Sequence, residues 1–504
     1  MTIGMLLRNF ASWTSAHGIP HIVTSKSKCL KVFWMLIVFV SVGLAIYFVS
    51  KLVTGYLDYK VNVDTKLRFE QRFFPAITIC NLNMFSKTQR KSVGTELEGL
   101  LTAYQSAMSG QGKDASWGFD WTNGTNAIQS LAETHLVLLA NQMFEANNGT
   151  LDIDYLEDFV LDCVFDNNDC NLTTDFKPHF DASFGYCVTF NHQNPPTYNS
   201  SRAGSHFGLK LVLKSNQADY LSITDSAGVR IAVHNQSEVS FPDAFGYNAA
   251  PGFVTSLAIK YVQTERLGDP YSECTKDSGY TVEGCVRECL QRVTVAKCDC
   301  ADPRLGPAPE TTSFCNRTQA VCLIETMTES FDEYDEESLI GDQQDRFNPL
   351  TSCQCEQRCL DWNFDATLST SLWPASELHG VTSTLCEQMD RSHCLDWLHE
   401  NTIAINIFYE KMNYLLLSEK EAKLFHELLS DIGGQLGLCL GFSVITFFEF
   451  FFFGALVLLF YWKRLHNNSR VDDDQQDKKR KASEKSDKQL EIQKEKMEME
   501  DTKN

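Results

Sequence analysis

Residues 32–50 read VFWMLIVFVSVGLAIYFVS, a run of 19 residues without a charge between Lys31 and Lys51. As an α-helix this run is about 28 Å long, close to the thickness of the hydrocarbon core of a bilayer. A cleaved signal peptide is the alternative, but its apolar region is usually about 7–15 residues long and lies nearer the start of the chain. We therefore expect a retained transmembrane helix at residues 32–50.

A second apolar run of 31 residues lies between Asp431 and Lys463, and Glu449 is its only charged residue. One helix of that length would reach about 46 Å, too long for an untilted span. Five glycines along the run permit a break or close backbone packing. A buried helical hairpin of a soluble protein is disfavoured by the unbroken stretch FFEFFFFGALVLLFYW. Residues 432–462 are therefore predicted to form the second transmembrane helix.

The charges beside these runs predict the topology. Residues 1–31 carry four basic residues and no acidic one, and Lys463-Arg464 follow the second run. Basic flanks are typical of the cytoplasmic side, so residues 1–31 and 463–504 are predicted to be cytoplasmic and residues 51–431 to lie outside the plasma membrane. Six N-x-Ser/Thr sequons, the acceptor pattern for glycosylation, fall in the predicted exterior: Asn123, Asn148, Asn171, Asn199, Asn235 and Asn316.

The acidic excess is concentrated between the two tails. The chain has a formal net charge of −21, and residues 32–462 alone carry −26. This excess argues against nucleic acid as a partner and favours cations or basic ligands. Residues 466–504 lack aromatic residues and alternate Lys with Glu, which predicts a disordered or loosely helical tail.

The cysteines indicate an oxidising compartment. Of 18 cysteines, Cys29 and Cys439 lie at or inside the apolar runs, and the other 16 fall in the predicted exterior, an even number that indicates eight disulfides. Zinc ligation by the C-x-C and C-x3-C spacings is the alternative, which the lack of matching histidine pairs disfavours. Spacing does not choose among pairings, but residues 274–359 should form one cross-linked unit.

The exterior mixes helical and strand patterns. Residues 95–108 and 133–146 are predicted to be helical, residues 184–262 alternate as strands do, and residues 402–417 read as one further strand. The fold class is therefore a membrane α+β protein with two transmembrane helices around a large disulfide-rich domain. An ectoenzyme, beside a membrane-anchored receptor, is the second functional class to weigh, but no catalytic motif is found that would favour an enzyme.

Several motifs occur in an order that is typical of one channel family. They are FPAITICNLN at 74–83, GVRIAVHNQ…AAPGF within 228–253, DIGGQLGLCLGFSVITFFE at 431–449, and His17-Gly18 before the first apolar run. With the cysteine block, the chain resembles the degenerin/epithelial sodium channel/acid-sensing ion channel family over roughly residues 15–465. The resemblance implies a homotrimer or heterotrimer in the lipid bilayer, with a hand-like ectodomain of palm, knuckle, finger, thumb and β-ball. It also implies Na⁺ as the permeant ion, an amiloride-type blocker and no cofactor.

The same resemblance implies a set of disulfides. Seven pairs follow from it: Cys80–Cys187, Cys163–Cys170, Cys274–Cys359, Cys285–Cys355, Cys289–Cys353, Cys298–Cys322 and Cys300–Cys315. Cys386 and Cys394 are left over, and because they lie close in the sequence we expect them to form the eighth pair.

The resemblance also assigns a pore and a gate. Gly441-Phe442-Ser443 corresponds to the narrow selectivity filter, in which Phe442 replaces an Ala of the acid-sensing members. Glu449 follows it along the pore, and a carboxylate inside a membrane segment is functional by default. His17-Gly18 corresponds to a cytoplasmic gating motif, and Ser430 to a site where a larger side chain holds the channel open. The neighbouring gating segment includes Asp431, Gly433 and Gly434.

The opening stimulus is predicted from substitutions. Acid-sensing members carry a His pair where this chain has Asn62-Val63, and glutamates where it has Leu415 and Ser418. None of these four side chains binds a proton near neutral pH. An extracellular neuropeptide of the FMRFamide type, which is cationic and aromatic, suits the acidic ectodomain better. Proton gating is the alternative, and the acidic run Asp332–Glu337 is the feature that favours it.

Overall fold

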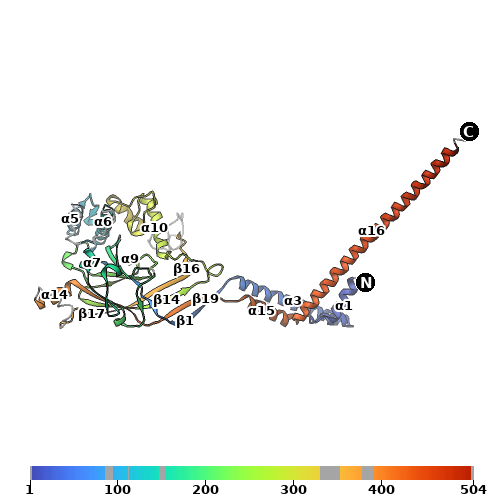
Figure 1. The fold of residues 1–504 in the computed structure, drawn as a ribbon, viewed down its shortest axis with the longest axis horizontal. Helices are drawn as coiled ribbons and strands as arrows, with labels where there is room; N and C mark the ends of the chain where they lie inside the picture. The colour runs from blue at the N-terminus through green and yellow to red at the C-terminus, as the bar shows by residue number, and fades with distance from the viewer. Residues whose placement is uncertain are drawn as a thin grey trace. The chain divides into compact units, whose positions relative to one another are not determined.

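The computed structural model describes residues 3–85, 95–111, 113–146, 154–193, 195–329, 352–376 and 390–500. The chain divides into two compact units, each described here by itself (Figure 1). The helical unit comprises residues 1–61 and 421–504, and the larger unit comprises residues 62–420.

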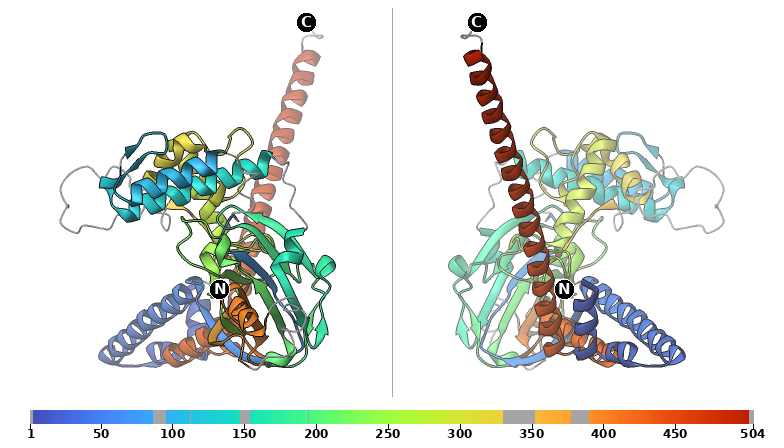
Figure 2. Two further views of the ribbon diagram at one scale, coloured as in Figure 1. Left: turned by 90° about the vertical axis from the view of Figure 1, so that its left-hand side faces the viewer. Right: turned by 90° about the vertical axis from the view of Figure 1, so that its right-hand side faces the viewer.

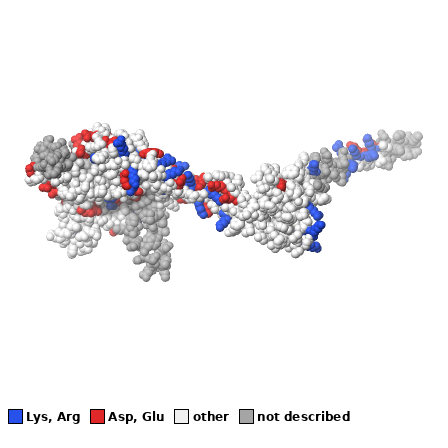
Figure 3. Space-filling model, turned by 90° about the horizontal axis from the view of Figure 1, so that it is seen from below, with Lys and Arg blue, Asp and Glu red and all other residues white. Residues whose placement is uncertain are grey.

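The helical unit contains α1 (Ile3–Trp13), α2 (Ile19–Thr24), α3 (Lys28–Leu57), α15 (Phe425–Leu440) and α16 (Val444–Glu500). Helix α3 contains the predicted span 32–50, and within this fully described helix Ala45 alone is buried. Large apolar side chains therefore point outward on all sides of α3, among them Phe39 at 80% exposure. A white belt over these helices in the space-filling view, bordered at one end by Lys and Arg, agrees with burial in lipid (Figure 3).

The second apolar run is not one helix. Helix α15 ends at Leu440, Gly441 adopts a left-handed φ of 63°, and α16 begins at Val444. The expected single helix over 432–462 is therefore replaced by two helices, because a glycine in this conformation ends a helix.

The C-terminal tail is helical and not disordered. Helix α16 continues through the tail to Glu500, where the sequence predicted disorder or loose helix (Figure 2). The tail is rich in Lys, Glu and Gln, which favour helix, and it places opposite charges four residues apart, as at Glu484 and Lys488.

The larger unit is built on an eight-stranded sheet with the order β1-β19-β14-β18-β11-β6-β7, in which β17 also pairs with β14. Strand β14 (Phe253–Glu265) pairs antiparallel with β17 (Leu360–Leu372) along its whole length. It pairs in parallel with β18 (Thr402–Tyr409) and β19 (Asn413–Glu421). The prediction of a single strand at 402–417 is therefore wrong. The segment forms two strands, β18 and β19, which pair with β14 one after the other along its length. The remaining strands of this sheet are β1 (Val61–Phe69), β6 (Val160–Phe165), β7 (Asn168–Asp169) and β11 (Leu209–Lys214).

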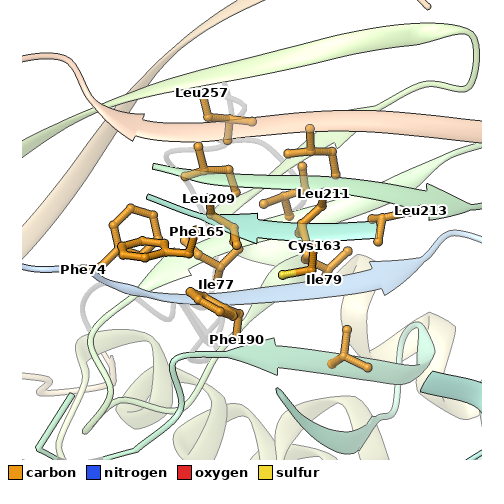
Figure 4. Packing of buried hydrophobic residues seen from close by; sticks show 14 of the residues in the cluster. Phe74, Ile77, Ile79, Cys163, Phe165, Phe190, Leu209, Leu211, Leu213 and Leu257 are labelled. Atoms are coloured by element: carbon orange, nitrogen blue, oxygen red, sulfur yellow. The ribbon is translucent and has the colours of Figure 1, made fainter. Parts of the chain in front are cut away.

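A five-stranded sheet packs against it, with the order β13-β12-β3-β9-β8. Its strands are β3 (Ala76–Asn81), β8 (Phe176–Asp181), β9 (Gly185–Phe190), β12 (Val229–His234) and β13 (Gly246–Ala249). One buried cluster takes side chains from both sheets, including Ile77, Ile79 and Phe190 from one and Leu209 and Leu211 from the other (Figure 4). This shared core fixes the two sheets to each other.

Helices form a second core in the larger unit. Helices α5 (Thr95–Met108), α6 (Thr125–Ala146), α10 (Val282–Cys298) and α11 (Ala320–Glu329) contribute to it. Helices α5 and α6 cover the predicted helical stretches 95–108 and 133–146. The shorter elements are β2 (Arg72–Phe73), β4 (Lys113–Asp114), β5 (Phe119–Asp120), η1 (Trp121–Asn123), α7 (Asp154–Phe159), α8 (Leu172–Asp175), β10 (Asn199–Ser200), η2 (Ser205–Phe207), η3 (Gln217–Asp219), α9 (Pro242–Phe245), β15 (Cys274–Thr275), η4 (Pro303–Leu305), η5 (Arg317–Gln319), β16 (Gln357–Arg358) and α14 (Arg391–Asn401).

Seven disulfides join pairs of cysteines among the described residues of the larger unit, and they coincide with the seven pairs that the family resemblance implies. Cys394 is also disulfide-bonded, while Cys386, its expected partner, lies outside the described residues. Among the described cysteines, Cys29 and Cys439 are free. Five of the seven bridges join residues of the 274–359 block to one another, as one cross-linked unit requires.

Candidate functional site

The candidate filter Gly441-Phe442-Ser443 is the non-helical link between α15 and α16. The amide of Gly441 donates to the carbonyl oxygen of Gly437 at 2.9 Å, and Phe442 donates to Leu436 at 3.3 Å. These bonds end α15 with a left-handed glycine cap. On the other side, Ser443 accepts from the amide of Thr446 through its hydroxyl at 3.3 Å and so caps α16. The link is therefore ordered by its own sequence.

The N-terminal segment of the helical unit contacts this link through His17. The His17 amide donates to the carbonyl oxygen of Leu440 at 3.1 Å. A Cβ placed on Gly441 would lie 1.4 Å from His17 Nδ1, so the imidazole occupies the space that a side chain would need. Gly18 has a φ of 90°, and a Cβ there would lie 2.5 Å from Val38 Cγ2. Two glycines thus allow the His17 loop to approach both α3 and the filter segment.

Glu449 is bound by the same N-terminal segment. Its carboxylate accepts from the Thr14 hydroxyl at 3.0 Å, the Ser15 amide at 2.8 Å and the Ser15 hydroxyl at 3.2 Å. The Ser15 hydroxyl also lies 2.6 Å from Thr446 Oγ1. The sequence did not predict these neutral partners of Glu449. The signal that could have found them is that Thr14 and Ser15 lie just before the His17-Gly18 motif, separated from it by Ala16 alone.

Aromatic rings add packing to this contact. The ring of Phe10 stacks on Phe453 at 4.3 Å and meets Phe450 edge-on at 5.1 Å. The ring of Phe442 also stacks on Phe450, with the ring centroids 5.7 Å apart. The bulky ring at the middle of the candidate filter is therefore directed onto α16 of its own chain.

The other predicted gating residues lie on α15, apart from this contact. Ser430 and Asp431 are exposed, and the Asp431 carboxylate pairs with Lys423 at 2.5 Å. Gly433 and Gly434 have open space at their Cβ positions among the described residues. The structure therefore brings His17 and Gly18 to the filter segment but does not bring residues 430–434 to it.

The positions that bear on the stimulus lie in neighbouring strands of the larger unit. Asn62 and Val63 are in β1, while Leu415 and Ser418 are in β19, the strand next to β1. Val63 is 58% exposed. The acidic run at 332–337 lies outside the described residues.

The predicted glycosylation sites can be placed with one exception. Asn123, Asn171, Asn199 and Asn316 are exposed, Asn235 is half-buried, and Asn148 lies outside the described residues. At Asn171, Asn235 and Asn316 the side-chain carbonyl accepts from the hydroxyl two residues later. The amide nitrogen, which would carry a glycan, is not used in those bonds.

Two apolar helices that border a large disulfide-rich, β-rich domain define a membrane protein of the two-span channel class. The chain belongs to the amiloride-sensitive sodium channel family, whose model matches residues 10–453. The members of this family are ion channels and not enzymes.

Curated relatives include several degenerins of Caenorhabditis elegans. The degenerin-like protein asic-2 is 29% identical over 478 residues, which are 88% of this chain and 85% of the relative. Degenerin deg-1 is 37% identical over 308 residues, 58% of this chain and 38% of the relative. Degenerin unc-8 is 32% identical over 354 residues, 67% of this chain and 44% of the relative. The match thus spans less than half of deg-1 and of unc-8, but most of asic-2.

Proposed function

We propose that the chain is a subunit of a trimeric, sodium-selective channel of the plasma membrane that an extracellular FMRFamide-type peptide opens. The observation that carries the channel proposal is the link Gly441–Ser443, which interrupts an apolar helix and contacts the His17 loop. Non-helical backbone at membrane depth is tolerated where it lines a water-filled path or is buried in protein. A filter accounts for such a link in a run that is otherwise apolar.

Selection for cations follows from the groups at this link. Three copies around one axis would present backbone carbonyls and the Ser443 hydroxyl, which can replace part of the water shell of Na⁺. Glu449 adds a negative charge six residues further along α16. Because Thr14 and Ser15 donate to its carboxylate, the charge is held at a fixed place. An amiloride-type blocker, itself a cation, would be attracted by the same groups.

The topology supports this assignment. With both termini in the cytoplasm, the larger unit lies outside the cell, where its disulfides are stable. The exposed sequons would then be glycosylated, and the His17 loop would contact the filter segment from the cytoplasmic end of the pore.

Peptide gating rests on charge and on the positions that lack proton-binding groups. Asn62, Val63, Leu415 and Ser418 do not titrate near neutral pH. Residues 32–462 carry a net charge of −26, which raises the encounter rate of a cationic peptide and its selection over anionic ones.

Voltage clamp of cells that express this chain alone tests the proposal. The bath is switched to FMRFamide and related amidated peptides at pH 7.4, and separately to pH 5 without peptide. Inward sodium current with peptide and little with acid is the expected result. A transient current on acidification alone would replace the peptide with the proton as the stimulus. Current under neither condition, from protein detected at the cell surface, would contradict a peptide-gated homotrimer and leave a heterotrimer to be tested by co-expression.

A further inference from the structure

A row of four polar side chains crosses the five-stranded sheet of the larger unit. Thr78 Oγ1 lies 2.8 Å from His234 Nε2 and 2.8 Å from Thr189 Oγ1, and Thr189 Oγ1 lies 3.4 Å from His179 Nδ1. The four residues come from β3, β12, β9 and β8, four adjacent strands. The strand register puts them on one face of the sheet, because Thr78 pairs with Thr189. Ile77 and Ile79, which flank Thr78, belong to the buried core on the other face.

The middle of the row is inaccessible and its ends are not. Thr78 is 0% and Thr189 is 8% exposed, whereas both histidines are partly exposed. The disulfide Cys80–Cys187 joins the next pair along the same face. Protons can therefore reach the two ends, while the disulfide keeps the two central strands in register.

One carbonyl fixes the direction of every hydrogen bond in the row. His234 Nδ1 lies 2.9 Å from the Asn235 carbonyl oxygen, which can only accept, so this nitrogen carries a proton. In the neutral ring Nε2 then accepts the Thr78 hydroxyl proton. Thr78 in turn accepts from Thr189, and Thr189 can only accept from His179 Nδ1. Three contacts are thus satisfied by three protons.

The number of protons already in the three contacts limits how many more protons the row can bind. A first added proton is accommodated, either on His179 Nε2 outside the row, or on His234 Nε2 with both hydroxyls reversed and the His179 proton moved to its Nε2. With both rings charged, four protons would face three contacts. One buried donor would then lack an acceptor, at a cost comparable to a lost hydrogen bond, and two like charges would repel.

Burial favours the neutral form of both histidines and of two nearby carboxyl groups. Burial lowers the pKa of His179 to about 4, and the charges of His234 and Lys177 lower it too, against a backbone hydrogen bond that raises it. Burial also lowers the pKa of His234. Burial raises the pKa of Asp181 and of Glu238. Among the described residues, the titratable groups on the same sheet face and on the elements packed beside it are Lys177, Asp181, Arg230, Glu238, Asp243, Glu283, Arg287, Arg358, Asp361 and Asp365.

We propose that the row His179–Thr189–Thr78–His234 is an acid-sensitive site that keeps both rings neutral in the folded unit, accommodates one added proton, and loosens its sheet when both rings become charged. The two rings communicate through the threonine hydroxyls, so they titrate as a coupled pair. The inference concerns the larger unit alone and does not rest on the proposed stimulus of the channel.

Thermal unfolding of the purified full-length protein in detergent, between pH 7.5 and 5.0, tests this. A histidine kept neutral in the native state costs up to about tenfold in the unfolding equilibrium constant per pH unit below 6.5, because the unfolded chain binds the proton. Asp181 and Glu238 contribute to the pH dependence of stability with the opposite sign, because a carboxyl whose pKa is raised in the native state stabilises that state as the pH falls. We expect His234→Gln to reduce the acid-induced drop in the unfolding midpoint by about half. His206→Gln, which changes an exposed histidine outside the sheets, should leave it unchanged.

A double-mutant cycle tests the coupling. The effects of His179→Gln and His234→Gln on the acid-induced drop in the unfolding midpoint should be non-additive in the wild-type background. They should be additive in Thr189→Val, which removes the hydroxyl that links the two rings. Thr189→Ser keeps that hydroxyl and should behave as wild type. An acid-induced drop that survives in both single histidine variants, or additivity in the wild-type background, would overturn the proposal. If His234→Gln yields no folded protein, His179→Gln at the other end of the row carries the same test against His206→Gln.

Discussion

The main-chain amide of His17 donates to the carbonyl oxygen of Leu440, and its imidazole fills the space that Gly441 leaves by having no side chain. These residues are more than 400 positions apart in the sequence. A residue in the N-terminal segment is therefore in contact with the residue where α15 ends, and any movement of the segment bears on the link Gly441–Ser443.

The first prediction concerns Gly441. Gly441→Ala would place a Cβ 1.4 Å from His17 Nδ1 at a backbone φ of 63°, so the loop must move or the link must change its conformation. We expect stimulus-evoked current to be lost at unchanged surface expression. The matched control is Gly454→Ala, which meets open space among the described residues inside α16 and should leave current intact. Normal current from Gly441→Ala would contradict the observed contact.

The second prediction concerns the charge at Glu449. Glu449→Gln keeps an acceptor for Thr14 and Ser15 but removes the negative charge, so sodium conductance should fall while the protein still reaches the surface. Thr14→Val, which removes one donor and leaves the charge, should have a smaller effect. Single-channel recording measures both. Equal conductance in Glu449→Gln and the wild type would place Glu449 outside the ion path.

The third prediction concerns a buried arginine that joins α10 to α9. Arg287 pairs with Asp243 at 2.7 Å and with Glu283 at 2.8 Å, and it lies 4.5 Å over the Phe241 ring. Asp243→Asn leaves a guanidinium that is 10% exposed and still paired with Glu283, so the loss of one carboxylate should cost about 2 kcal/mol of unfolding free energy.

The control for the arginine test is an exposed ion pair. Lys60 and Asp58 are 70% and 56% exposed at 3.4 Å, and Lys60→Met should change the unfolding free energy by less than about 1 kcal/mol. Equal effects of Asp243→Asn and Lys60→Met, measured by denaturant unfolding of the purified protein, would show that burial does not strengthen the Arg287 pair.

The fourth prediction concerns the disulfides. Replacing both members of Cys285–Cys355 by Ser removes a bridge that closes a 70-residue separation, at a cost of about 2–5 kcal/mol. Surface biotinylation should detect less protein. Cys29→Ser, which changes a free cysteine, should leave surface expression unchanged. Undiminished expression of the paired variant would mean that the bridge adds little to folding.

Much of this organisation can be read from residue patterns, and the exceptions have physical reasons. Both apolar runs, the cysteine block and the helical stretches follow from composition and period. The break at Gly441 could not be placed from glycine content alone, because five glycines occur in the same run and the left-handed one is chosen by capping bonds. The partners of Glu449 were missed because Thr14 and Ser15 lie outside the spans and are ordinary polar residues. The two strands at 402–421 looked like one because both are apolar and both pair with β14.

The most direct test of the central claim is the reversal potential of current through this chain, measured in a Ser430→Phe background, which the proposed role of Ser430 predicts to be open without a stimulus. The account predicts a reversal potential that moves by about 59 mV for each tenfold change in external sodium, with little response to external potassium. It also predicts that adding Ser443→Ala reduces this preference, while adding Ser12→Ala in the N-terminal segment does not. A reversal potential that ignores sodium, or one that Ser443→Ala leaves unchanged, would contradict the assignment of residues 441–443 as the selectivity filter.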